Sequence, residues 1–247
     1  ADHLAVIFDA GRKTFRNDLY PEYKAHRPPP PPDLIPQFAL IRDAARAFGV
    51  PALEADNYEA DDLIAAYARA ARAEGWEVRI VSADKDLMQL IRDGVELYDP
   101  IKNRTIGATE VQEKFGVPPD KVIDVQALAG DSTDNIPGVP GIGVKTAAEL
   151  ITTYGSLEQL LERAAEIKQP KRREALQNNV ELARISRQLV TLDDHAPLPV
   201  PVHDLHVKLD PEVLRAFLVK QEFKSLLARL ENSLSGRGGV PLSLREG

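Results

Sequence analysis

Two short apolar runs constrain the fold of this chain most. The run "HLAVIF" ends directly before Asp9, and the run "WEVRIVS" ends two residues before Asp84. Both are rich in β-branched residues, so we expect two buried strands, with shorter strands at "VPALE" and "VELYDP". Ligands of parallel α/β sheets bind beyond the carboxyl ends of the strands. Asp9 and Asp84 should therefore face the same crevice.

The segments between these strands have helical spacing. We expect helices over 34–48, 58–74 and 87–91, and a mostly helical chain from about 108 to about 231. Alternating strands and helices predict an α/β fold with a mainly parallel sheet. The domains we expect are an α/β core over 1–130, a helical region over 131–232 and a linker tail over 233–247. Because the first strand begins almost at once, we also expect a piece of a longer protein.

Composition excludes several function classes. The 247 residues contain no Cys, which rules out disulfides, zinc–thiolate sites and thiol nucleophiles. No apolar run reaches the ~18 residues of a membrane span, and no signal peptide is visible. We therefore expect a cytoplasmic protein without membrane contact.

Positive charge is concentrated in two places, although the net charge is −7. The segment 11–33 holds Arg12, Lys13, Arg16, Lys24 and Arg27, interleaved with Phe15, Tyr20 and Tyr23. A second basic group, "KQPKRR", follows near residue 170. A solvated helix is the ordinary interpretation of the first segment. Its position directly after Asp9 favours nucleic acid instead, because bases stack on aromatic rings while cations follow the phosphates.

Acidic residues gather at four predicted element ends. Each group alone has an ordinary explanation, such as a helix first turn or an Asx-turn. Together they would place seven or eight negative charges in one crevice, which is tolerable only if cations neutralise them. Oxygen ligands without His or Cys favour Mg²⁺ or Mn²⁺, and two such ions ~4 Å apart serve phosphodiester cleavage. The expected metal ligands are Asp9, Glu59, Asp61, Asp62, Asp84, Asp86, Asp131 and Asp134.

The stretch "GVPGIGVKTAAELI" predicts a DNA-binding turn. It resembles a helix–hairpin–helix element, in which glycines let the backbone approach a phosphate and the next helix donates amides to it. Gly138, Gly141 and Gly143 supply the glycines, and Lys145 and Thr146 add side-chain contacts. A glycine-rich loop between two helices is the alternative.

Four motifs in order carry a resemblance to a known family. "FDAGRKTFRNDLYPEYKAHRP", "YEADD", "ADKDLMQL" and "GDSTDNIPGVPGIGVKTA" together resemble the 5′-nuclease domain of bacterial DNA polymerase I, a relative of the flap endonucleases. The similarity runs from residue 1 to about 230. It implies a PIN/5′-nuclease-like parallel α/β core with a helical arch and a helix–three-turn–helix region, and the eight acids match the metal-site acids of the family.

The resemblance also implies roles and partners. Lys24, with Asp84 and Asp86, would be catalytic, and a K⁺ ion would bind backbone carbonyls around Gly138 to Gly143. The substrate would be DNA with a 5′ flap or a 5′ end at a duplex junction, cleaved in primer removal and repair in the bacterial nucleoid. A polymerase domain is expected after the chain. The DNA-binding residues would be Arg16, Tyr23, Lys24, Arg27, Gly138, Gly141, Gly143, Lys145 and Thr146.

One departure from the family keeps alternatives open. Family members carry an early "DG" metal ligand and a nearby arginine, some tens of residues before the equivalent of Asp9, and this sequence shows neither. A catalytically impaired DNA-binding module is therefore the second interpretation. A PIN-type ribonuclease is the third, but compact members of that class generally lack the basic segment and the glycine hairpin.

Overall fold

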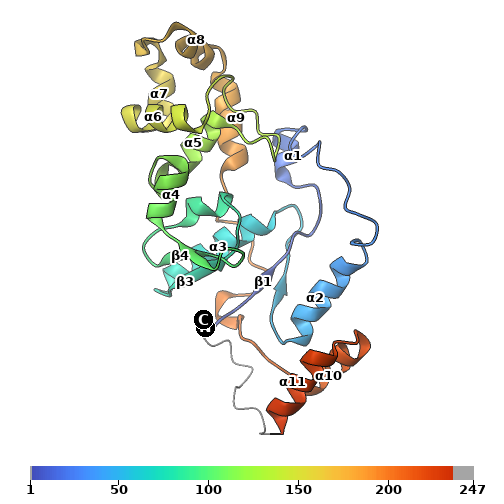
Figure 1. Ribbon diagram of the computed structural model, residues 1–247. Coiled ribbons are helices and arrows are strands. Elements are labelled where there is room, and N and C mark those ends of the chain that lie inside the picture. The colour runs from blue at the N-terminus through green and yellow to red at the C-terminus, as the bar shows by residue number, and fades with distance from the viewer. Residues whose placement is uncertain (1, 236–247) are drawn as a thin grey trace. The chain divides into compact units, whose positions relative to one another are not determined.

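The computed structural model describes residues 2–235 of the chain (Figure 1). The chain forms two compact units, and each is built from separate stretches of sequence. The large unit consists of Asp9–Pro28 and Ala55–Leu198. The small unit consists of Ala1–Phe8, Pro29–Glu54 and Pro199–Gly247.

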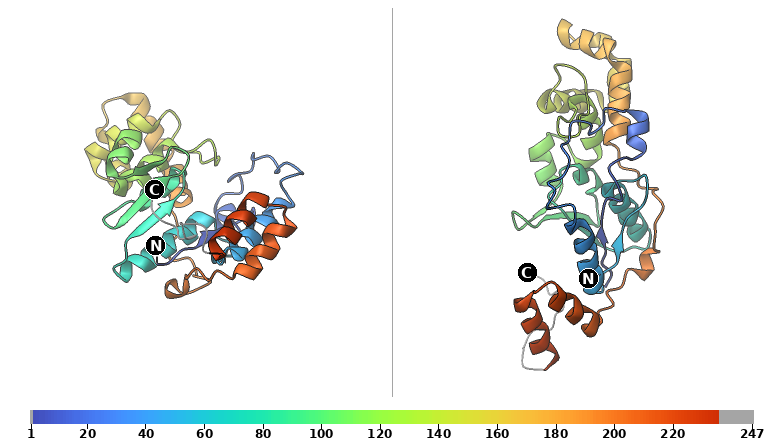
Figure 2. Two further views of the ribbon diagram at one scale, coloured as in Figure 1. Left: turned by 60° about the horizontal axis from the view of Figure 1, so that its bottom comes forward. Right: turned by 90° about the vertical axis from the view of Figure 1, so that its right-hand side faces the viewer.

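In its described residues, the small unit combines one pair of strands with three α-helices. Strands β1 (Val6–Ile7) and β2 (Ala52–Leu53) pair in parallel. Helix α10 packs against α11 and contacts α2 (Figure 2), around a core that includes Ala47 and Leu214. The helices are α2 (Gln37–Ala47), α10 (Pro211–Lys220) and α11 (Lys224–Leu234), with a short 3-10 turn, η4, at Val202–Asp204.

The first apolar run is a shorter strand than predicted, and it is not buried. The strand itself covers only Val6 and Ile7 of the run, and Val6 is 38% exposed. Within residues 2–235, β1 pairs along one edge alone, with β2. A strand that pairs along one edge only can leave part of its apolar surface in solvent. Its composition alone therefore does not predict burial.

The large unit holds a three-stranded sheet. Strand β3 (Val78–Val81) pairs in parallel with β4 (Val95–Asp99), and β4 pairs antiparallel with β5 (Arg104–Ile106). Helix α3 (Ala60–Ala73) contacts β3 and buries Leu63 and Ala66 completely. Gly75 follows α3 with a φ of +78°, a conformation that glycine adopts without strain.

Helices make up the rest of the large unit, and α5 (Val122–Ala129) lies at their centre. It packs against α6, α7 and α9 (Figure 1), and its Val122, Val125 and Leu128 are fully buried. The α-helices are α1 (Phe15–Leu19), α4 (Ala108–Phe115), α6 (Val144–Tyr154), α7 (Leu157–Glu162), α8 (Pro170–Asn178) and α9 (Val180–Val190). The 3-10 turns are η1 (Asp86–Leu90), η2 (Pro119–Lys121) and η3 (Ala164–Glu166).

The α/β class with a helical C-terminal region is confirmed, but its arrangement differs from the prediction in three ways. The described strands form two sheets rather than one. The helices after residue 130 share one hydrophobic core with β3 and β4, so the compact units do not divide there. Helix α11 continues to Leu234, into the predicted linker, and the rest of that linker, 236–247, lies outside the described residues. No helix within residues 2–235 is long and apolar enough to cross a membrane.

Candidate active site

One cavity of the large unit gathers the predicted acids. Seven of the eight carboxylates line it, although they come from four separate stretches of sequence. Basic side chains of the segment after Asp9 line the same cavity, as does Lys85. The seven acids are Asp9, Glu59, Asp61, Asp84, Asp86, Asp131 and Asp134.

The eighth acid, Asp62, has a structural role. Its two oxygens accept hydrogen bonds at 2.7 Å from both terminal nitrogens of Arg16, and also the backbone N–H groups of Glu59 and Asp193. Asp62 is 0% exposed and Arg16 is 1% exposed. Burial opposes the charge of Arg16, but the hydrogen bonds and charge of Asp62 hold the pKa of Arg16 above its ordinary value. Because the two buried side chains bind each other, the metal-ligand role predicted for Asp62 and the DNA contact predicted for Arg16 do not fit the structure.

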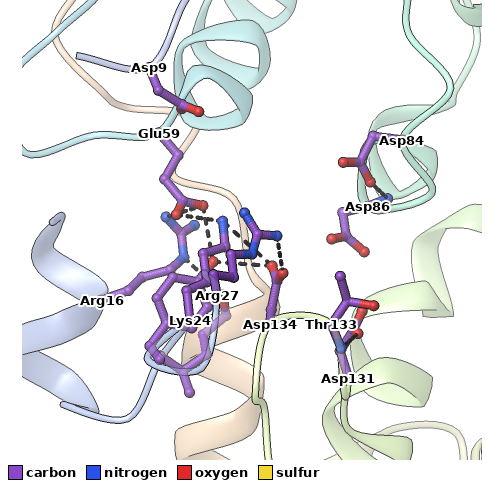
Figure 3. Close-up of polar contacts among 12 residues, drawn as sticks. Asp9, Arg16, Lys24, Arg27, Glu59, Asp84, Asp86, Asp131, Thr133 and Asp134 are labelled. Atoms are coloured by element: carbon purple, nitrogen blue, oxygen red, sulfur yellow. Dashed lines mark hydrogen bonds and ion pairs between the residues drawn. The ribbon is translucent and has the colours of Figure 1, made fainter. Parts of the chain in front are cut away.

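The first turn of α3 positions the next acids. Glu59 is the N-cap residue and Asp61 follows in the first turn. Asp9 accepts the backbone N–H of Ala60 at 2.7 Å, which orients its carboxylate toward this helix end. Figure 3 shows Asp9 and Glu59 on one side of the site, above the basic side chains.

The basic segment after α1 is anchored to the loop that carries Asp134. The backbone N–H of Lys24, a residue with a φ of +54°, donates to the carbonyl of Asp134 at 2.9 Å. The Lys24 ammonium lies 2.7 Å from Glu59 and 3.5 Å from Asp134, and Arg27 contacts the other Asp134 oxygen. These cations neutralise one half of the acid cluster (Figure 3).

The aromatic residues of this segment are used for packing, which the sequence did not indicate. Tyr23 is 4% exposed, and its hydroxyl donates to Glu59 at 3.0 Å. Burial and the charge of Glu59 raise the pKa of Tyr23 above its ordinary value. Phe15 packs against Tyr58 with ring centroids 5.8 Å apart, and Tyr20 packs on the core. The predicted stacking of bases on Tyr23 does not fit its burial.

Three other acids of the cluster, Asp61, Asp84 and Asp86, form no ion pair with a Lys or Arg within residues 2–235. Asp84 lies beyond β3 and accepts the backbone N–H of Asp86 at 2.9 Å. Burial, reinforced by the charges of Asp84 and Glu59, raises the pKa of Asp61 to about 7. Burial also raises the pKa of Asp86 to about 6, against a hydrogen bond from Gln126. Burial and the neighbouring carboxylates therefore outweigh the positive charge of Lys24 near Asp61 and of Lys85 near Asp86.

Asp131 is held by its own loop and by Lys85. Its Oδ1 accepts the backbone N–H of Thr133 at 2.8 Å, and its Oδ2 accepts the ammonium of Lys85. Burial opposes the shift, yet the hydrogen bonds from Lys85 and Thr133 hold the pKa of Asp131 below its ordinary value. Lys85 and Gln126 were not among the predicted site residues. The sequence signal that could have identified Lys85 as a site residue is its position between the predicted ligands Asp84 and Asp86.

The carboxylate oxygens of the cavity suit hard divalent cations, although their side chains are not arranged as a preformed coordination site. Among residues 2–235, no three His, Cys, Asp or Glu side chains are placed as metal ligands around one point. All seven acids offer oxygen donors, which Mg²⁺ and Mn²⁺ prefer. Burial and mutual repulsion raise the pKa values of Asp61 and Asp86, and a bound cation would offset that repulsion.

The predicted glycine turn has two kinds of glycine. Gly138 has a φ of +62°, and a Cβ there would lie 2.4 Å from the backbone nitrogen of Gly130. Its N–H donates to the buried Ser186 of α9 at 3.0 Å. Gly138 is therefore required by packing inside the hairpin. A Cβ at Gly141 or Gly143 would meet nothing within 4 Å, so these two leave the backbone accessible.

Helix α6 begins at this accessible part of the turn. Gly143 is its N-cap residue, and Lys145 in the first turn is exposed. The buried Val139 and Ile142 hold the turn against the core, so the first amides of α6 are presented on a fixed backbone.

Comparison with known proteins decides the family. A model of the 5′-3′ exonuclease N-terminal resolvase-like domain matches residues 1–116, and a model of the 5′-3′ exonuclease C-terminal SAM fold matches residues 117–212. The chain belongs to the 5′-3′ exonuclease family. The 5′-nuclease resemblance drawn from the four motifs is thereby confirmed.

Similar curated proteins are DNA polymerases I. The Rhizobium leguminosarum enzyme is 55% identical over 231 residues, which cover 92% of this chain and 22% of that protein. The Bacillus caldotenax enzyme is 40% identical over 94% of this chain and 27% of its own length. The chain therefore spans about a quarter of the relatives it matches.

Similar solved structures share the fold. A bacteriophage T5 flap endonuclease, solved as a pseudo-enzyme–product complex with DNA and metal ions, superposes with a TM-score of 0.66. It is 22% identical and covers 91% of this chain and 81% of its own. The catalytic core of Rad2 in complex with a DNA substrate reaches a TM-score of 0.52 at 17% identity, covering 90% of this chain and 76% of its own.

Proposed function

We propose that this 5′-3′ exonuclease domain hydrolyses DNA phosphodiester bonds at 5′ flaps and 5′ ends of duplex junctions. The observation that carries the proposal is the convergence of seven carboxylates in one cavity, with too few cations to neutralise them. Such a cluster is suited to divalent metal ions and, through them, to a phosphate backbone.

The ions we propose are two Mg²⁺ or Mn²⁺. Asp61, Asp84 and Asp86 would hold one of them, and Asp131 with Asp134 would contribute to the other. When bound, the ions would supply an activated water nucleophile and neutralise charge at the scissile phosphate. Asp9 and Glu59 flank the group and are oriented by the first turn of α3.

Lys24 is the residue we propose to act on the substrate. Its ammonium lies at the wall of the cavity beside Glu59, and its side chain is 21% exposed. From this position it can contact a phosphate and stabilise the charge that develops as the bond breaks. Arg27, whose side chain is 45% exposed, is the second candidate for a phosphate contact on this side of the cavity.

The glycine turn at residues 138–143, together with the start of α6, is the proposed binding site for the DNA duplex. The open backbone at Gly141 and Gly143 and the first amides of α6 suit one phosphate, with Lys145 and Thr146 beside it. A K⁺ ion at the carbonyls of residues 138–143 remains part of this proposal. Since the similar curated proteins are DNA polymerases I, we also propose a polymerase domain as a partner in the natural protein, acting in replication and repair at the bacterial chromosome.

Cleavage of a 5′-labelled flap DNA in Mg²⁺, compared with EDTA, tests the proposal. We expect Mg²⁺-dependent release of short 5′ products, and a loss of at least about 100-fold in rate for Asp84→Asn. Asp120→Asn is the matched control, because its side chain is 71% exposed and does not line the cavity. Binding of flap DNA without cleavage in Mg²⁺ or Mn²⁺ would support the DNA-binding module instead.

A further inference from the structure

Lys85 separates two kinds of carboxylate in the cavity. It lies in sequence between Asp84 and Asp86, yet its ammonium contacts neither of them and bonds to Asp131 instead. The Lys85 side chain is 35% exposed, whereas that of Asp131 is 4% exposed. A carboxylate so little exposed requires hydrogen-bonding or charged partners, and Asp131 has the backbone N–H of Thr133 on one oxygen and the Lys85 ammonium on the other.

In the described part of the chain, the neighbouring acids accept hydrogen bonds from uncharged donors only. Within residues 2–235, no Lys or Arg forms an ion pair with Asp61, Asp84 or Asp86. Asp134 resembles Asp131 in this respect, because Arg27 and Lys24 contact it. The cavity therefore has one open group of acids and one group whose charge the chain itself neutralises.

We propose that in the metal-free protein the Lys85 ammonium neutralises Asp131 in place of a divalent cation, and that a cation must displace it in order to bind Asp131. An ion that uses Asp61, Asp84 and Asp86 enters without breaking an ion pair. An ion that uses Asp131 must first displace the ammonium, because a lysine and a divalent ion on the same carboxylate repel each other. The Lys85 side chain is partly exposed, and the long, rotatable stem of a lysine lets its ammonium move toward solvent. The inference rests on the proposed metal-dependent function.

Two consequences follow for the protein without DNA. The two groups of acids bind divalent ions with unequal affinity, and the weaker event is the one that competes with Lys85. In the absence of metal, Lys85 stabilises the folded state by neutralising Asp131. A purely structural lysine would predict only the second of these effects.

Calorimetric titration with Mn²⁺ alone, without DNA, tests the inference. We expect Lys85→Met to tighten the weakest Mn²⁺ binding event by about five- to tenfold, as expected when one partly buried ion pair no longer competes. Lys85→Arg, which keeps the charge, should stay close to the parent. Lys114→Met removes the same charge from an exposed position on α4 and serves as the control for net charge.

Thermal unfolding supplies a second readout. In EDTA, Lys85→Met should melt below the parent, and saturating Mn²⁺ should remove most of the difference. Lys85→Gln, which keeps a hydrogen-bond donor for Asp131, repeats the titration if the Met variant does not fold. If Lys85→Met and Lys85→Gln both bind Mn²⁺ no more tightly than Lys114→Met does, the inference is wrong. The nuclease proposal would be unaffected by that result. A parent chain that binds no Mn²⁺ at millimolar concentration would overturn both.

Discussion

The buried pair of Arg16 and Asp62 gives a sharp prediction, because the sequence suggested a different role for each residue. Arg16 also donates to the carbonyls of Leu189 and Thr191, each at 2.9 Å, so the pair connects α1 and α3 with the end of α9. Neither side chain is exposed by more than 1%, and solvent screening is therefore negligible.

Asp62→Asn leaves the guanidinium buried with Glu59, at 3.6 Å, as the nearest remaining acid. Removing one partner of a buried pair costs about 3–5 kcal/mol, out of a total free energy of unfolding of about 5–15 kcal/mol. We expect this loss for Asp62→Asn in EDTA. Replacing both partners, Arg16→Met with Asp62→Leu, should recover most of it, since well-packed apolar side chains remove the desolvation cost.

Urea unfolding followed by fluorescence measures this effect. Trp76 is the single tryptophan and belongs to the large unit, so its emission reports the unit that contains the pair. Asp84→Asn is the matched control: it changes an exposed acid of the same cavity and should cause no loss of stability in EDTA. A loss below about 1 kcal/mol for Asp62→Asn, with weakened Mn²⁺ binding, would refute the structural assignment.

Three further predictions concern pH, DNA affinity and turnover. In the folded, metal-free protein the pKa of Asp61 is raised from 3.8 to about 7. Between about pH 4 and 7, Asp61 therefore keeps its proton in the folded state and loses it in the unfolded chain. The protein's free energy of unfolding should therefore fall between about pH 4 and 7, and thermal unfolding in EDTA should show less of this fall in Asp61→Asn. Lys145→Ala should weaken binding to all duplex sequences alike and reduce the salt slope of log K by about one; an unchanged slope removes Lys145 from the interface. Lys24→Ala should slow single-turnover cleavage by about 10²–10³-fold, with only a several-fold change in flap-DNA affinity in Ca²⁺. Near-normal turnover would mean that Lys24 only neutralises Glu59 and Asp134.

Much of the fold was predictable from local pattern. Helices α2 and α3 and strands β3 and β4 lie where periodicity placed them. The division into sheets was not predictable, because pairing depends on which strands meet across the sequence and not on the composition of any one strand. Strand β5 was not predicted; it follows a turn at Asn103, which has a φ of +50°.

The site was predictable as a cluster of acids but not in its internal pairing. The convergence of seven acids in one cavity could be predicted, because each lies at the end of a strand or helix or in the loop after α5. Spacing could not show that Arg16 turns inward to Asp62, since the partners are 46 residues apart in sequence. The same limit applies to Lys85 and Asp131, also 46 residues apart. Ion pairing between distant segments is a property of packing, and charge patterns along the sequence do not determine it.

The central claim is that the cavity holds divalent metal on its carboxylates. Crystals soaked in Mn²⁺ and measured at the manganese absorption edge test it most directly, because anomalous scattering locates the ions without reference to activity. We predict a strong peak within coordination distance, about 2–2.6 Å, of the oxygens of Asp61, Asp84 and Asp86, and a weaker one beside Asp131 and Asp134. Manganese peaks elsewhere on the protein, with none in this cavity, would contradict the account.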